Sequence, residues 1–212
     1  MKNFIFSEGV IQRVSQYLRF LIELKDIGKR TVTSSDISEN TKINSAEIRR
    51  DLINLRIKGK RGVGFNIDAL INSFNQILGH EANVKLILVG AGNLGRAILN
   101  YQILKKFGFN IEYVFDNNEK IIGKKISEKE VMDIIFLQDV INENNIRVAI
   151  LAVSQSSAQK VTDLLVKSGI KVIINYTSVP IEAPPHVNIQ TNDPIEKLLH
   201  TLYYLSNTGQ AF

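Results

Sequence analysis

Residues 84–101 read VKLILVGAGNLGRAILNY, in which an apolar run leads into glycines at positions 90, 92 and 95. The run before Gly90 predicts a buried strand, and NLGRAILNYQILKKF (93–107) predicts the helix that follows it. At this spacing Gly90 permits a sharp turn, Gly92 lets the backbone approach a pyrophosphate, and Gly95 lets the helix pack closely on the sheet. Free N–H groups at the start of the helix favour negative charge. The stretch therefore predicts a dinucleotide-binding turn.

An acidic residue completes this pattern at the end of the next predicted strand. Asp116 ends IEYVFD (111–116), about 20 residues past Gly95, where a carboxylate binds the ribose 2′-hydroxyl. A carboxylate there repels a 2′-phosphate, so the pattern favours NAD(H) over NADP(H). Arg96 is the residue that could serve a 2′-phosphate instead, but it belongs to the glycine turn. The predicted cofactor site comprises Gly90, Ala91, Gly92, Asn93, Leu94, Gly95 and Asp116; the alternative for Asp116 is a polar strand terminus.

The rest of the C-terminal part alternates between strands and helices. RVAILAV (147–153) and KVIIN (171–175) are short β-branched runs, and SSAQKVTDLLVKSG (156–169) between them has helical periodicity. Such alternation predicts an α/β fold with a Rossmann-like, doubly wound parallel sheet. The chain closes with PIEKLLHTLYYLSN (194–207), a predicted helix with an apolar stripe of Ile195, Leu198, Leu199, Leu202 and Leu205.

The first 78 residues read as helices with one short interruption. Apolar residues recur at helical spacing up to Gly28, and a short helix around SSDISEN (34–40) follows. The next helix begins at Asn44, an expected N-cap, with Glu47 three residues on as in a capping box. Its predicted buried stripe consists of Ile48, Leu52 and Leu55. A glycine-rich basic turn, KGKRGVGFN, and the amphipathic helix IDALINSFNQIL complete the segment.

Three helices and a basic turn are typical of a winged helix-turn-helix, whose second helix enters the major groove while the wing approaches the phosphates. Arg50 points away from the buried stripe and Arg49 lies at its edge, so both are candidates for bases or phosphates, with Lys60 and Arg61 for the backbone. The first 78 residues hold 13 Lys and Arg against 8 Asp and Glu, whereas the remainder is neutral. This asymmetry favours nucleic-acid contact. The alternatives are a generally basic surface, or a small helical cap with solvated arginines.

Composition excludes several classes of function. The chain of 212 residues has no cysteine, which removes disulfides, thiolate metal sites and thiol redox chemistry. No run of 18 apolar residues is present, and the first residues lack the pattern of a signal peptide. We therefore expect a cytoplasmic protein with no metal site.

Residues for catalysis are missing from the pattern. None of the three histidines, His80, His186 and His200, falls where a nicotinamide-dependent enzyme needs a proton donor. Tyr101 and Lys105 have the spacing of a short-chain dehydrogenase pair, but they lie on the predicted helix of the glycine turn instead of one far downstream. No stretch remains for a substrate domain. We therefore expect no catalytic residues and no enzymatic activity.

Six motifs together resemble the Rex family of redox-sensing transcriptional repressors. They are RVSQYLRFL, EIRRDL, GKRGVGFN, VGAGNLGRAILNY, FDNNEKIIGKKI and LLVKSGIKVIINY. The resemblance runs from about Ser7 to Asn207. It implies a winged-helix DNA-binding domain at 1–78, a Rossmann NAD(H)-binding domain at 79–190, and a dimerisation helix at 191–212 that is swapped onto the partner.

The resemblance also implies a function. Family members are homodimers that repress transcription from operator DNA, an expected inverted repeat; NADH releases them and NAD+ competes. The positions that match the family's DNA contacts are Ser45, Arg49, Arg50, Lys60 and Arg61, and those that match a hydrogen-bonded link between the domains are Arg19, Tyr101 and Asp193.

Three segments depart from the family pattern. INLRIKGK (53–60) stands where members commonly have an aromatic, glycine-bearing segment, which affects operator preference. Ser154 replaces a proline, and YTSVP (176–180) replaces a Phe-Ala-Pro segment, both near the expected nicotinamide pocket.

Two other interpretations remain open at this stage. One is a small NAD-dependent oxidoreductase whose basic N-terminal part only dimerises. The other is a DNA-binding protein that senses a different nucleotide, such as CoA. Asp116 distinguishes the second, because replacing it weakens NADH binding and matters little for CoA.

Overall fold

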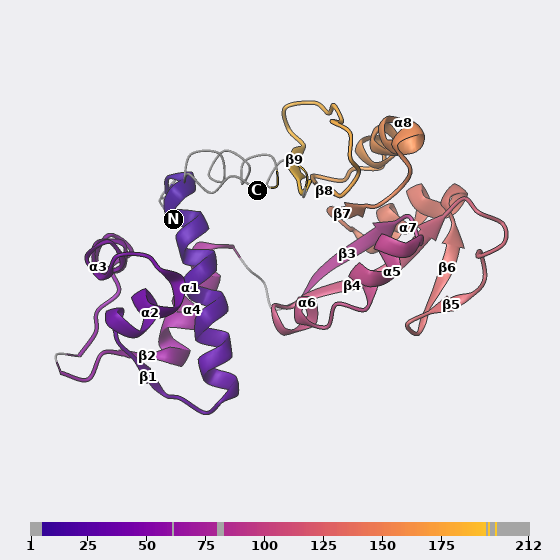
Figure 1. Cartoon of the computed structure of the whole chain (residues 1–212). Helices are drawn as coiled ribbons and strands as arrows, with labels where there is room; N and C mark the ends of the chain where they lie inside the picture. Colours follow the sequence, from indigo (N-terminus) through magenta and orange to yellow (C-terminus); the bar gives the residue numbers. More distant parts are fainter. Residues whose placement is uncertain (1–5, 61, 80–82, 194, 196–197, 199–212) are drawn as a thin grey trace, which may run out of the picture. The chain divides into compact units, whose positions relative to one another are not determined.

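The computed structural model describes residues 6–60, 62–79, 83–193, 195 and 198 (Figure 1). The chain divides into two compact units, Met1–Glu81 and Ala82–Phe212. Within the described residues, no helix has the length and apolar character needed to cross a membrane.

The first unit is built from four helices and a small two-stranded sheet. In chain order these are α1 (Glu8–Asp26), β1 (Thr31–Val32), α2 (Ser34–Thr41), α3 (Ser45–Asn54), β2 (Phe65–Asn66) and α4 (Ile67–Ile77). The rings of Tyr17 on α1 and Phe74 on α4 pack with centroids 6.1 Å apart, and both side chains are fully buried. Strand β2 pairs antiparallel with β1, with Thr31 opposite Asn66. The winged helix-turn-helix arrangement is confirmed.

The predicted N-cap of α3 is present, but the predicted capping box is not. Asn44 does cap α3, since its Oδ1 accepts a hydrogen bond from the Ala46 N–H at 2.8 Å. Glu47 does not reach back to complete a capping box, because its carboxylate pairs with Arg13 at 3.1 Å. The capping box lies one helix earlier, where Thr33 and Asp36 bond reciprocally.

A buried carboxylate fastens α3 to α1. Asp51, 2% exposed, accepts hydrogen bonds from Nε and Nη2 of Arg13 at 2.7 Å each and from the Tyr17 hydroxyl at 2.8 Å. Burial raises the pKa of Asp51, but the hydrogen bonds from Arg13 and Tyr17 outweigh it and leave that pKa below its usual value. Arg13 also reaches Glu47, so one guanidinium joins α1 to two turns of α3.

The second unit contains a seven-stranded sheet of order β5-β6-β4-β3-β7-β8-β9. All neighbours in it are parallel except β5 and β6. The order of the six parallel strands reverses beside β3, the first in the chain, as in a Rossmann fold. The strands are β3 (Val84–Val89), β4 (Phe109–Asp116), β5 (Lys125–Ile126), β6 (Lys129–Asp133), β7 (Val148–Leu151), β8 (Val172–Asn175) and β9 (Asn188–Thr191).

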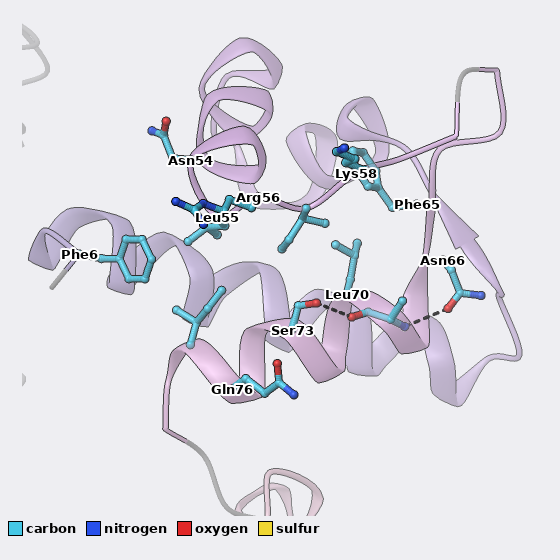
Figure 2. A pocket seen from close by; sticks show the side chains of 13 residues that line it. Phe6, Asn54, Leu55, Arg56, Lys58, Phe65, Asn66, Leu70, Ser73 and Gln76 are labelled. Carbon is cyan, nitrogen blue, oxygen red and sulfur yellow. Dashed lines mark hydrogen bonds between the residues drawn. The ribbon is translucent and has the colours of Figure 1, made fainter. Parts of the chain in front are cut away.

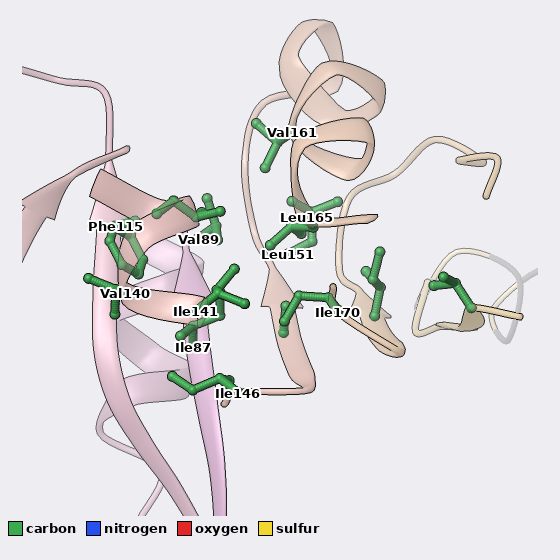
Figure 3. Close-up of a cluster of buried hydrophobic side chains, with 14 of the residues drawn as sticks. Ile87, Val89, Phe115, Val140, Ile141, Ile146, Leu151, Val161, Leu165 and Ile170 are labelled. Atoms are coloured by element: carbon green, nitrogen blue, oxygen red, sulfur yellow. The ribbon is translucent and has the colours of Figure 1, made fainter. Parts of the chain in front are cut away.

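Helices cover the two faces of this sheet unequally. On one face α7 (Leu137–Asn144) and α8 (Gln155–Lys167) enclose the larger core, which includes Ile87, Phe115 and Leu165 (Figure 3). On the other face only the short helices α5 (Asn93–Leu99) and α6 (Ile103–Lys106) pack over Leu86, Leu88 and Ile150. The second face is therefore the less covered one among the described residues.

The predicted helix 93–107 is wrong in one respect, because it is broken into α5 and α6. The break follows Asn100, whose side-chain amide donates to the Arg96 carbonyl at 2.9 Å and whose Oδ1 accepts from Ser127. Asparagine side chains compete in this way with helical backbone bonds. Tyr101 consequently lies between two helices instead of within one.

The sequence analysis predicts no helix or strand between residues 117 and 146. In the structure this segment contains β5, β6, the 3₁₀-helix η1 (Ile134–Phe136) and α7. Strand β9 was also missed, and the predicted terminal helix lies outside the described residues apart from Ile195 and Leu198.

We expect Asp51→Ala to lower the free energy of unfolding by about 3 kcal/mol, because it removes the acceptor of the buried Tyr17 hydroxyl and leaves the Arg13 guanidinium with the Glu47 carboxylate alone. Urea denaturation followed by circular dichroism measures the loss. The matched control is Asp68→Ala, whose pairing with Lys25 at 2.7 Å joins two exposed side chains, so that it costs less than about 1 kcal/mol. Equal losses in the two variants contradict the assignment.

Tyr17 predicts a loss of stability at alkaline pH. Burial, and then the hydrogen bond to Asp51, raise the pKa of the Tyr17 phenol above its ordinary value. The neutral phenol thus stabilises the folded state below the unfolded pKa of about 10, and this contribution falls by about 1.4 kcal/mol per pH unit above it. Denaturation between pH 8 and 11 is expected to show a steeper decline for the wild type than for Tyr17→Phe. Parallel curves refute this role of Tyr17.

Candidate nucleotide site and DNA-binding surface

The turn between β3 and α5 requires glycine at two positions for steric reasons. A Cβ added at Gly90, whose φ is +100°, would lie 2.3 Å from the carbonyl oxygen of Ala152 on the neighbouring strand connection. A Cβ added at Gly95 would lie 1.9 Å from the carbonyl oxygen of Gly90. Gly92 differs, since a Cβ there would meet no atom within 4 Å. The backbone at Gly92 therefore borders open space into which a ligand can approach.

Asp116 closes the turn from the next strand. Its Oδ2 accepts the Ala91 N–H at 2.7 Å, and its Oδ1 accepts the Asn118 N–H at 2.9 Å. A carboxylate oxygen has room for a second donor, so both atoms can still accept a ligand hydroxyl. Asp116 thus orders the turn and remains a candidate ribose partner.

Arg96 is engaged with the turn itself. Its Nε donates to the Ala91 carbonyl at 3.0 Å. This bond holds the Arg96 side chain against the backbone of the glycine turn, to which the prediction assigned it.

A cavity of about 250 Å³ joins these parts at the carboxyl edge of the sheet. Of the predicted residues, Gly90, Gly92 and Asp116 line it, whereas Ala91, Asn93, Leu94 and Gly95 do not. Apart from Ser154, the lining residues that the sequence did not predict for this site are Val89, Asn117, Asn118, Ile134, Ala152, Val153, Ser157 and Val161. Most of them directly follow a strand, and that position is the signal that could have found them.

Two of the three departures from the family pattern, Ser154 and the segment 176–180, are expected near the nicotinamide. Ser154 lines this cavity at the start of α8, where its Oγ lies 3.2 Å from the hydroxyls of Ser156 and Ser157. Tyr176 instead lines an apolar groove of about 340 Å³ on the α5 face of the sheet. Ser178 of the same segment accepts a hydrogen bond from the Gln155 side chain, next to Ser154, at 2.6 Å, so the expectation that both departures border one pocket stays a prediction.

Helix α3 presents a polar, basic face. Arg49 and Arg50 are exposed, and the Arg49 guanidinium donates to the Ser45 hydroxyl at 3.2 Å. The opposite side of the helix is buried at Ile48 and Leu52. Arg50 thus points away from the core, as predicted.

The glycine-rich segment forms a tight turn before β2. The Lys60 N–H donates to the Gly64 carbonyl at 2.8 Å, and the Gly64 N–H returns to the Lys60 carbonyl at 2.9 Å. Lys60 is exposed at this turn, while Arg61 lies outside the described residues. The segment has the position of a wing.

The three residues predicted to link the domains belong to different units. Arg19 on α1 is exposed and pairs with Glu23 at 3.7 Å. Tyr101 is 49% exposed between α5 and α6, and the Asp193 carboxylate accepts the Ile195 N–H at 2.9 Å. Their coupling stays a prediction.

A cavity of about 680 Å³ in the first unit lies between α4 and the segment that follows α3 (Figure 2). Its lining includes Arg56, Lys58 and Ser73 but neither Arg49 nor Arg50. It is therefore separate from the basic face of α3.

A winged-helix unit joined to a Rossmann-like nucleotide unit defines a ligand-responsive transcriptional regulator. Models of known families match each unit: "Putative DNA-binding protein N-terminus" matches residues 6–52 and "CoA binding domain" matches residues 81–179. Over its full length the chain is 37% identical to the redox-sensing transcriptional repressor Rex of Thermoanaerobacter sp. (strain X514), covering 94% of that protein. For the repressor of the same name from Clostridioides difficile (strain 630), the identity is 39%, over 96% of this chain and 97% of the relative.

Solved structures agree with these relatives. RSP, a Rex-family repressor, in complex with β-NAD+ and operator DNA matches with a TM-score of 0.86 at 36% identity, over 97% of this chain and 94% of that one. The RSP complex with β-NADH matches with a TM-score of 0.81 at 35% identity, over 97% of this chain and 96% of that one. The chain belongs to the Rex family of redox-sensing transcriptional repressors. The predicted fold class is confirmed, and the relatives are repressors, not enzymes.

We expect Gly95→Ala to destabilise the second unit by about 2–3 kcal/mol, because the new methyl group forces α5 away from the Gly90 carbonyl. Gly92→Ala is the matched control. Its methyl group enters open space at a φ of −69°, so that stability changes by no more than about 0.5 kcal/mol. Thermal unfolding followed by circular dichroism compares them. A Gly92→Ala variant that is as unstable as Gly95→Ala contradicts this geometry.

Proposed function

We propose that this protein is a cytoplasmic, homodimeric transcriptional repressor that binds an inverted-repeat operator and is released from it by NADH. The observation that supports this most directly is the presence, in one chain, of an arginine-bearing helix α3 and a glycine-turn cavity closed by Asp116. The RSP structures, solved with β-NAD+ and operator DNA and with β-NADH, are of a protein with the same two units.

In this proposal the nucleotide occupies the cavity at the carboxyl edge of the sheet. The backbone from Gly90 to Gly95 holds the pyrophosphate, for which the opening at Gly92 and the start of α5 are suited. Asp116 accepts hydrogen bonds from the adenosine ribose. The nicotinamide then extends toward Ser154, since the glycine turn and Ser154 line the same cavity.

The proposed DNA contacts lie on the first unit. Ser45, Arg49 and Arg50 would face the major groove from α3, while Lys60 and Arg61 would meet phosphates from the wing. The basic excess of this part of the chain supports the assignment. Two such units related by a twofold axis require two half-sites, which is why the operator is an inverted repeat.

The C-terminal segment is proposed to hold the dimer together. Its apolar stripe must be buried, and Ile195 and Leu198 are 54% and 60% exposed. The apolar groove on the α5 face, lined by Leu86, Ile150 and Tyr176 among others, is a surface that the partner's segment 191–212 can cover. The proposed domains are therefore a DNA-binding domain at 1–78, a nucleotide-binding domain at 79–190 and a dimerisation segment at 191–212.

Release from DNA is a population shift between two states of the dimer. NAD+ and NADH differ at the nicotinamide, by one positive charge and by the planarity of the ring. A ligand shifts the equilibrium only through its different affinities for the two states. A hundredfold loss of operator affinity corresponds to about 2.7 kcal/mol of coupling. Arg19, Tyr101 and Asp193 are the proposed carriers of this coupling between units.

A second candidate ligand is CoA, because the model that matches residues 81–179 is described as a CoA binding domain. The position of Asp116 favours NAD(H), since its carboxylate lies at the turn where a ribose 2′-hydroxyl is bound in dinucleotide sites. CoA carries a phosphate on its ribose, which this carboxylate repels. Competition between the two ligands is therefore part of the test.

The decisive experiment is selection of a duplex from random DNA, followed by its titration with protein in the presence of NAD+, NADH or CoA. The expected result is an inverted repeat that is bound tightly with NAD+ and at least a hundredfold more weakly with NADH. Specific binding that is indifferent to both nucleotides contradicts the redox response, and absence of specific binding contradicts the repressor assignment.

Asp116→Asn serves as the test variant in the same titration. It retains an acceptor for the Ala91 N–H but loses the charge, so that NADH affinity is expected to fall about tenfold or more while operator binding without NADH is retained. Asp163→Asn is the control, because that carboxylate pairs with Gln159 on α8 outside the cavity. Equal NADH affinity in both variants argues against the proposed site.

A further inference from the structure

We propose that Ile53 reads the 5-methyl group of a thymine in each operator half-site, beside the base pair that Arg50 contacts. This inference rests on the proposed function and adds a specificity-determining residue to it. It comes from an apolar side chain that the structure leaves exposed on the side of α3 that carries Arg50.

The helical spacing puts Ile53 on the outward face. Ala46, Arg50 and Ile53 follow one another at intervals of four and three residues, which is one side of a helix. The side that packs on the unit carries Ile48 and Leu52, which are 0% and 1% exposed. Ile53 is 71% exposed. It is therefore not part of the core of this unit, although it is an isoleucine on a helix whose other large aliphatic side chains are buried.

Exposure alone does not assign a role to an isoleucine. Ile27 is also 71% exposed, but it caps the end of α1. What distinguishes Ile53 is its position one turn from Arg50, on the face that also displays Arg49. Ile53 is thus an apolar side chain on a cationic surface.

A duplex of DNA is the occupant whose chemistry matches this face. Its phosphates complement Arg49, Arg50 and Lys60, and an arginine binds O6 and N7 of guanine in the major groove. The thymine methyl is the apolar group that the major groove offers to a side chain. An aliphatic side chain that is held among arginines at the base edges thus pairs with a thymine.

The spacing along the helix locates that thymine. Arg50 and Ile53 are separated by three residues, or about 4.5 Å of rise at 1.5 Å per residue. Successive base pairs are about 3.4 Å apart. Ile53 therefore meets the base pair next to the one contacted by Arg50. Ala46 lies one turn in the other direction, and its small side chain makes at most a weaker contact of the same kind.

The experiment replaces thymine by deoxyuridine, which removes the methyl group and leaves the hydrogen-bonding edge unchanged. In the selected duplex, the thymines next to the guanine of each half-site are replaced, one position at a time. The wild-type dimer is expected to lose about fourfold in affinity per half-site, the value of one buried methyl group, at one of these positions. Ile53→Ala is expected to bind the thymine and deoxyuridine duplexes equally.

Two further variants separate recognition from folding. Ile53→Val retains a branched aliphatic side chain and is expected to keep the discrimination against deoxyuridine. Ile27→Ala is the matched control, an equally exposed isoleucine of the same unit, and is expected to keep the full fourfold loss. NADH binding is measured for every variant and is expected to be unchanged.

The outcomes distinguish this inference from the proposed function. Specific binding with no effect of deoxyuridine at any such position, or a loss that is the same in Ile53→Ala as in the wild type, overturns the reading of thymine by Ile53 and leaves the repressor standing. Absence of any specific duplex overturns both. Discrimination that is lost in Ile53→Ala and retained in Ile27→Ala establishes Ile53 as the residue that reads the methyl group.

Discussion

The close approach of the Gly95 backbone to the carbonyl of Gly90 constrains the nucleotide-binding unit more than any other contact. With no side chain at either position, α5 starts against the end of β3, and its first N–H groups point to the carboxyl edge of the sheet. The Asp116 carboxylate then ties the turn to β4 through the Ala91 N–H. The cavity lies beside these contacts, and Gly90, Gly92 and Asp116 form part of its lining.

In the first unit the corresponding constraint is electrostatic. The buried Asp51 carboxylate is held by Arg13 and Tyr17, so α3 is fixed in rotation as well as in position. Because side chains on one helix keep a fixed angular relation, fixing the buried face also fixes the outward face with Arg50 and Ile53. A buried ion pair is weak evidence for stability by itself, and its best-attested use is to specify register. Here the register is that of the helix proposed to read DNA.

Much of this arrangement follows from sequence, and the failures have physical causes. The glycine turn, Asp116 and the parallel strands were predictable because period and spacing are local signals. The break after Asn100 was not, since it depends on side-chain bonds to Arg96 and Ser127. Glu47 satisfied a capping-box spacing and yet pairs with Arg13, 34 residues earlier in the sequence. Asp51 interrupts an apolar stripe, and that interruption was the available signal for a buried network.

The glycine turn is ordered before a ligand binds, and it does not distinguish NAD+ from NADH. Asp116 already orders the glycine turn through backbone hydrogen bonds, so little of the binding energy is needed to order that end of the cavity. The adenosine and pyrophosphate of NAD+ and NADH are identical, and contacts to them are equal for both. In the proposed site the difference in affinity arises from contacts to the nicotinamide, for which the Ser154 hydroxyl and its neighbours are candidates. A serine cluster offers neutral dipoles in place of a fixed charge. In the proposed site, the orientation of these hydroxyls would affect the response to the charge of NAD+ without any change in the glycine turn.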